Sequence, residues 1–158
     1  MMALHTNKDS AHIMHLIRKN TIGAEIGVWM GNTSTQFLKK GLKKFYMVDP
    51  YSVEPYKNSS EMTYQEWLAK YQPITGEIAE AGFQKFYERV WKEIKSRFEH
   101  MNEVELCRET SDSFFERYLA SKGHGNFEML DWIYIDGNHS YEQCIKAVSY
   151  THLTLPTT

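Results

Sequence analysis

A glycine-containing turn after a short apolar segment is the first place in the chain that could do chemistry. Residues 24–28 (AEIGV) are expected to form a strand that stops at Gly27, and a helix is expected to begin near Asn32 or Thr33, just after Gly31. Glycine lets a ligand approach the backbone closely, and the first turn of a helix presents free N–H groups to the same space. The segment therefore predicts a binding site for a nucleotide-like ligand.

A second apolar segment, residues 45–49 (FYMVD), ends in a carboxylate, Asp49. In an open parallel sheet, an acid about 20 residues after the first glycine accepts the two hydroxyls of a ribose. A dinucleotide-binding turn would need a second glycine where this chain has Trp29, so we predict a ligand without a pyrophosphate. The structural alternative is a pair of turn glycines and a turn acid before Pro50.

A third block, residues 130–142 (LDWIYIDGNHSYE), combines a buried-type strand, a turn at Asp136 and a helix that Ser140 can cap. Asp136 would follow the carboxyl end of a strand, where open α/β sheets bind ligands. His139 stands beside it. In the alternative interpretation, Asp136 only stabilises the turn and His139 only bonds to nearby backbone.

These blocks resemble the cofactor site of class I S-adenosylmethionine-dependent methyltransferases. The pattern Glu-x-Gly-x-x-x-Gly at residues 25–31, followed by a strand that ends in an acid, is similar to that family. The block Ile-Asp-Gly-x-His-Ser-Tyr at residues 135–141 is similar to a subgroup with sugar and small-molecule O-methyltransferases and cephalosporin-hydroxylase-like proteins. The resemblance implies an α/β fold with a Rossmann-like, mainly parallel sheet flanked by helices, incomplete in its C-terminal half. It also implies methyl transfer from S-adenosylmethionine to a hydroxyl of a sugar or other small molecule.

The resemblance further implies roles for individual residues. The residues implied to bind the cofactor are Glu25, Gly27, Gly31, Ser34, Asp49, Thr110, Ser111 and Asp112. The last three follow a third expected strand at 103–108, where similar methyltransferases contact the adenine. The alternative for them is a helix N-cap, with Ser111 or Asp112 as the capping residue. Asp136 and His139 are implied to be catalytic, and Asp136 is also a tentative ligand of magnesium.

The expected reaction explains why such groups are needed. Methyl transfer is an in-line displacement, so holding the methyl group and the acceptor in attack geometry supplies much of the rate enhancement. A hydroxyl acceptor must also lose a proton, which either His139 as a base or a cation held by Asp136 would make easier. Magnesium usually takes one or two carboxylates. In metal-dependent relatives further acidic ligands follow a later strand, which this sequence does not contain.

Two other functions remain open at this stage. One is a non-catalytic module that binds a nucleotide or S-adenosylmethionine. The other is an NAD-binding Rossmann oxidoreductase, against which Trp29 argues.

We expect one domain over residues 1–148, truncated at its C-terminal end, with a helical insertion at about 52–101. An opening helix is expected at about 10–19. In the insertion, aromatic residues between 83 and 98 recur at helical spacing, which favours core packing. The alternative is an acceptor lid containing Tyr51, Tyr56 and Tyr64. Residues 149–158 contain no Lys, Arg, Asp or Glu, and we expect them to be a non-native tail.

Composition limits the partners of the chain. Its 158 residues are 42% hydrophobic and 24% charged, which is enough for one core. The net charge of −2 provides no basic field for nucleic acid, so we expect a small-molecule partner and no nucleic acid. Two cysteines without metal or disulfide spacing, and no secretory or membrane-length apolar segment, predict a cytoplasmic location without membrane association.

Overall fold

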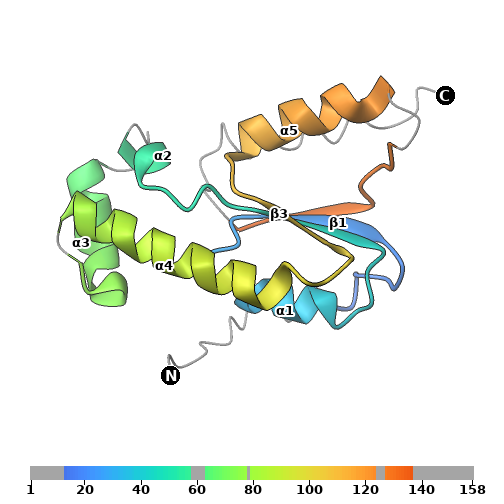
Figure 1. Ribbon diagram of the computed structural model, residues 1–158, viewed down its shortest axis with the longest axis horizontal. Coiled ribbons are helices and arrows are strands. Elements are labelled where there is room, and N and C mark those ends of the chain that lie inside the picture. The colour runs from blue at the N-terminus through green and yellow to red at the C-terminus, as the bar shows by residue number, and fades with distance from the viewer. Residues whose placement is uncertain (1–12, 58–62, 78, 124–126, 137–158) are drawn as a thin grey trace.

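Four parallel strands form the sheet at the centre of the structure, a computed structural model that describes residues 13–57, 63–77, 79–123 and 127–136 (Figure 1). The strands are β1 (Ile22–Ile26), β2 (Lys44–Val48), β3 (Val104–Cys107) and β4 (Trp132–Ile135), in the spatial order β3-β2-β1-β4. The chain moves outward from β1 to β2 and β3 and then crosses to the other side of β1. This arrangement confirms the predicted α/β, Rossmann-like fold.

Helices cover both faces of this sheet. They are α1 (Asn32–Leu38), α2 (Glu54–Lys57), α3 (Tyr64–Thr75), α4 (Glu80–Phe98) and α5 (Ser111–Ala120), followed by a short 3-10 helix at Ser121–Gly123. In Figure 1, α1 and α4 lie on one face and α5 on the other, while α2 and α3 lie beyond the edge where the strands end. Among the described residues, no helix is both long and apolar enough to cross a membrane.

Two apolar cores follow from this layering. Side chains of a strand alternate between faces, so Phe45 and Met47 of β2 belong to the core under α1 and α4, whereas Tyr46 and Val48 belong to the core under α5. Both faces of β2 are therefore buried, as is usual for parallel sheets covered by helices.

The predicted stripe of α4 packs into the first of these cores. Its buried side chains are Phe83, Phe86, Tyr87, Val90, Ile94 and Phe98. The prediction of core packing is confirmed.

Helix α3 begins with a capping box, in which Thr63 and Glu66 bond to each other's backbone N–H groups.

Two predictions of local structure were wrong. β1 begins at Ile22 and ends at Ile26, two residues before the predicted bounds, because Gly27 has a φ of 90° that leaves the strand conformation. The described part of the expected opening helix, from Ile13 onward, contains turns, with an N–H bond from Leu16 to the carbonyl of Ile13. Its apolar residues still pack on the first core, and burial of one side is the feature that the periodicity detected.

Candidate functional site

The loops that follow β1, β2 and β4 meet at one edge of the sheet. The N–H of Gly27 donates to the carbonyl of Val48 over 2.8 Å, and the N–H of Asp136 donates to the carbonyl of Ile26 over 2.8 Å. Gly27, Asp49 and Asp136 are therefore brought together, as the sequence predicted. The crossover from β3 to β4 makes this edge the topological switch point, where ligands of open α/β sheets bind.

Asp49 holds two of these loops in place. Its Oδ2 accepts the N–H of Trp29 at 2.9 Å, and its Oδ1 accepts the N–H of Tyr51 at 2.8 Å. The carboxyl group is buried, and burial raises its pKa while the backbone N–H bonds oppose that shift. The backbone N–H of Val28 also bonds to this carboxyl group, and a carboxylate has about four lone-pair sites, so Asp49 could still accept one ligand hydroxyl. Its role as the ribose ligand stays a prediction.

Glu25 is a buried carboxyl group next to the same edge. The hydroxyl of Ser34 donates to its Oε2, which joins β1 to α1. Burial raises the pKa of Glu25 from 4.5 to about 8, the Ser34 bond opposes this, and the charges of Asp136 and Asp49 raise it further. Burial therefore favours the protonated form of Glu25. Asp49 and Asp136 therefore lie close enough to Glu25 for their charges to act on it.

The turn after β1 is built from residues in the left-handed region. Gly27, Trp29 and Gly31 have φ values of 90°, 51° and 69°. Such a φ is unusual for tryptophan and persists where surrounding contacts hold it. The Tyr51 hydroxyl, which donates to the carbonyl of Trp29 at 3.1 Å, and Asp49 supply such contacts.

The structure gives Gly31 and Trp29 different surroundings from those predicted. A Cβ on Gly31 would lie 2.8 Å from Cδ1 of Ile94 and 3.0 Å from Cε2 of Phe98, so side chains of α4 fill the space that was expected to be open to a ligand. The predicted contact of Gly31 with the cofactor stays a prediction, but its lack of a side chain serves helix packing.

The Trp29 indole belongs to an aromatic cluster of the insertion. Its ring centroid lies 5.5 Å from that of Phe86, 5.7 Å from Tyr87 and 6.1 Å from Tyr71. Its size is therefore explained by packing in this cluster.

The residues predicted to contact the adenine follow β3. The N–H of Asp49 donates to the carbonyl of Cys107 at 3.1 Å, so the end of β3 lies beside Asp49. The cluster does cap α5, as the structural alternative held, but the capping residue is Thr110, whose hydroxyl accepts the N–H of Ser113, and not Ser111 or Asp112. The N-cap must have extended backbone, and Thr110, with a ψ of 161°, precedes the first helical residue.

Tyr51 and Arg108 contribute to the site in ways that the sequence did not reveal. Tyr51 is 1% exposed and is a structural link between two loops, which contradicts its interpretation as part of a lid. Arg108 follows β3, pairs with Glu88 of α4 and donates to the carbonyl of Tyr51 at 3.4 Å. The sequence signal that could have pointed to Tyr51 and Arg108 is that each follows shortly after the end of a strand.

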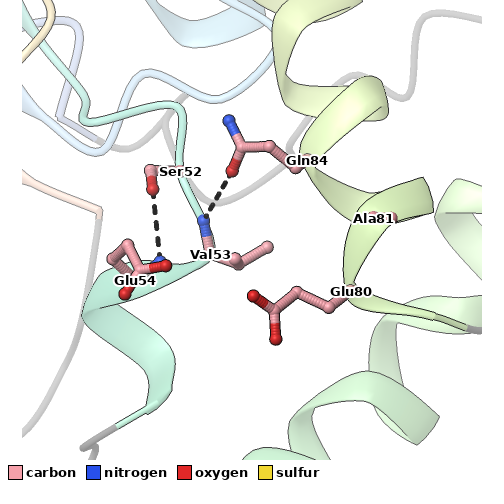
Figure 2. Close-up of a pocket in the computed structure, with 6 residues that line it drawn as sticks. All are labelled: Ser52, Val53, Glu54, Glu80, Ala81 and Gln84. Atoms are coloured by element: carbon pink, nitrogen blue, oxygen red, sulfur yellow. Dashed lines mark hydrogen bonds between the residues drawn. The ribbon is translucent and has the colours of Figure 1, made fainter.

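A shallow pocket lies elsewhere, between α2 and the start of α4 (Figure 2). Its lining residues are Ser52, Val53, Glu54, Glu80, Ala81 and Gln84. The amide oxygen of Gln84 accepts the N–H of Val53 at 3.4 Å, and the N–H of Glu54 donates to Ser52 at 3.2 Å (Figure 2). None of the predicted site residues lines this pocket.

Asp136, the tentative magnesium ligand, is the last of the residues that the structure describes. Within residues 13–57, 63–77, 79–123 and 127–136, no group of three or more His, Cys, Asp or Glu side chains is arranged to hold a metal. His139 lies outside the described residues, as do the predicted tail at 149–158 and the helix expected from Ser140.

Comparison with known proteins identifies the family of the chain. The family model described as a methyltransferase domain matches residues 24–157, which include all four loops at the carboxyl edge. A comparison with curated proteins found no match. The order of the strands, the three carboxyl groups at the switch point and this match agree with one another. The chain therefore belongs to the methyltransferase domain family.

Proposed function

We propose that the chain is an S-adenosylmethionine-dependent methyltransferase that acts on a hydroxyl of a sugar or another small molecule. The observation that carries the proposal is the convergence of Glu25, Asp49 and Asp136 at the switch point of a sheet whose family transfers methyl groups. The subgroup resemblance at residues 135–141 supports the choice of a hydroxyl acceptor.

The residues at this edge fit S-adenosylmethionine in their charge. The cofactor carries a positive sulfonium and, at its amino-acid end, an ammonium and a carboxylate group, so it is a net cation, and it supplies an activated methyl group when bound. The charges of Asp49 and Asp136 raise the pKa of Glu25, and a nearby cation would offset that repulsion. The remaining lone-pair site of Asp49 would accept a ribose hydroxyl, and the turn at Gly27 would lie against the amino-acid end.

The chain's own residues would then act on the acceptor. The backbone N–H of Asp136 bonds to the carbonyl of Ile26, which holds the backbone of this residue at the switch point. There it would orient the acceptor hydroxyl or share a magnesium ion with it. His139, three residues further along, would take the proton of that hydroxyl.

A nucleotide-binding module without catalysis is the alternative from another functional class. It predicts that the chain binds S-adenosylhomocysteine but transfers no methyl group. It also predicts that Asp136→Asn leaves that affinity unchanged and is equally without turnover. An NAD-dependent oxidoreductase is less favoured, because Trp29 replaces the second glycine of the dinucleotide turn and packs among aromatic side chains.

Calorimetry and a transfer assay test the proposal. We expect the full chain to bind S-adenosylhomocysteine and not NAD, and to transfer labelled methyl from S-adenosylmethionine to at least one member of a panel of sugars and phenols. Asp136→Asn should keep the affinity within a few-fold and lower turnover by about 100-fold or more, the range of a lost general acid–base or orienting group. Binding of NAD alone would contradict the proposal. Binding of S-adenosylhomocysteine without transfer to any acceptor would favour the binding module.

A further inference from the structure

The turn after β1 needs support from outside its own sequence. Three of its residues, Gly27, Trp29 and Gly31, have left-handed backbone. A non-glycine residue in this region costs on the order of 1–3 kcal/mol and persists only where surrounding contacts hold it. Asp49 and Tyr51 hold the turn at Trp29. The end of the turn, at Met30 and Gly31, is held by a different part of the chain.

Arg97 of α4 contacts that end of the turn. Its Nη1 donates to the carbonyl of Met30 at 2.7 Å, and its Nη2 donates to the hydroxyl of Thr35 at 2.9 Å and to the carbonyl of Gly31 at 3.4 Å. The Thr35 hydroxyl in turn donates to the same Gly31 carbonyl at 2.8 Å. One guanidinium therefore joins the turn to the first turn of α1.

The guanidinium is itself held in position. It lies over the ring of Phe98, 4.7 Å from the ring centroid, and Phe98 and Ile94 fill the space beside Gly31. Its ion pair with Glu93 is long, at 3.9 Å, and Glu93 is largely exposed. The contacts to the turn are therefore the principal hydrogen bonds of Arg97, and the planar fork of arginine suits several acceptors at once.

We propose that Arg97 is a positioning residue of the cofactor site, which keeps the turn at residues 27–31 in its binding conformation. The inference rests on the proposed function, because the ligand of the turn is taken to be S-adenosylmethionine. It assigns to the insertion, through α4, a part in cofactor affinity. Arg97 lies on the side of the turn that faces α4, so it acts through the backbone of the turn.

Arg97→Met tests the proposal, with Arg89→Met as the matched control. Arg89 is on the same helix, its side chain is 67% exposed, and it makes a 3.9 Å ion pair with Glu77 and lies 5.6 Å from the centroid of the Phe86 ring. We expect Arg97→Met to speed amide hydrogen exchange in residues 27–35 and to weaken binding of S-adenosylhomocysteine by about tenfold. Exchange elsewhere in the sheet should match that of Arg89→Met. The KM for the cofactor should rise while kcat changes little.

Two further variants keep the test decisive. Arg97→Lys retains a donor for the Met30 carbonyl, so it should restore part of the affinity. Thr35→Val removes one acceptor without touching α4, so it should loosen the same segment to a smaller extent and serves if Arg97→Met does not fold. The inference would be overturned if Arg97→Met matched Arg89→Met in both amide hydrogen exchange and affinity for S-adenosylhomocysteine. If Arg97→Met does not fold, wild-type exchange and affinity in Thr35→Val would overturn it. A wild-type chain that does not bind S-adenosylhomocysteine would overturn the proposed function, while the exchange data would still decide whether Arg97 holds the turn.

Discussion

Glu25 shows how one buried carboxyl group can connect stability to pH. Its side chain is 1% exposed, and burial raises its pKa from 4.5 to about 8. The folded chain therefore binds a proton at Glu25 over a pH range in which the unfolded chain has released it. Because the folded-state pKa is raised, the stabilising contribution is complete below pH 4.5 and is lost as the pH rises through about 8.

Glu25→Gln is expected to remove this pH dependence. The amide has the same shape, can accept the Ser34 hydroxyl and cannot ionise. Relative to wild type, the free energy of unfolding of the variant should rise with pH between 5 and 8, at up to about 1.4 kcal/mol per pH unit. Urea unfolding at several pH values measures it. A difference between the two proteins that stays constant over this range would contradict the assigned protonation state.

Asp49→Asn tests the double role of Asp49. One carboxylate oxygen becomes an NH2 group, which cannot accept the N–H of Trp29 or of Tyr51. We expect a loss of about 1–3 kcal/mol in stability, the usual cost of a buried polar group without its partner. Affinity for S-adenosylhomocysteine should fall as well. Glu99→Gln, at a side chain that is 54% exposed, is the control and should change neither quantity. Wild-type stability in Asp49→Asn would show that these bonds contribute little.

At the scale of elements, the packing of α4 against the turn after β1 joins the insertion to the candidate site. The turn was expected to be open at Gly31, and α4 was expected only to pack on the core. The structure joins the two, since Ile94 and Phe98 occupy the space beside Gly31. The insertion therefore takes part in shaping the candidate site.

Gly31→Ala should disrupt this contact. The added Cβ would lie 2.8 Å from Ile94, and alanine is also strained at a φ of 69°. Gly76→Ala is the matched control, because Gly76 has a φ of 72° and nothing within 4 Å of an added Cβ. Both variants should lose stability, and Gly31→Ala should lose about 1–3 kcal/mol more, the usual cost of overpacking. Chemical denaturation measures both. Equal losses would mean that α4 moves aside without cost.

For the whole molecule, ligand binding and folding are expected to be coupled. A ligand that binds only the folded chain stabilises it by about 2.7 kcal/mol at 100 times its dissociation constant, which corresponds to roughly 5–10 °C in melting temperature for a chain of this size. S-adenosylhomocysteine should give such a shift and NAD should give none, in thermal melts at matched concentrations. A shift with NAD alone would favour the oxidoreductase.

The sequence by itself determined the fold class and the edge at which the candidate site lies. Acids and glycines directly after apolar segments predicted Gly27, Asp49 and Asp136 at one edge, because the carboxyl ends of parallel strands meet there. The helical period of α4 predicted its buried side. These features are local, since they depend on residues within a few positions of one another.

Only the tertiary structure decided what these residues touch. Arg97 reaches Met30 from 67 positions away, and the hydroxyl of Tyr51 reaches Trp29 from 22. Periodicity reports which side of a helix is buried, but not which loop it is buried against. The protonation of Glu25 was equally hidden, because a pKa depends on burial and on neighbouring charges that converge only when the strands are paired.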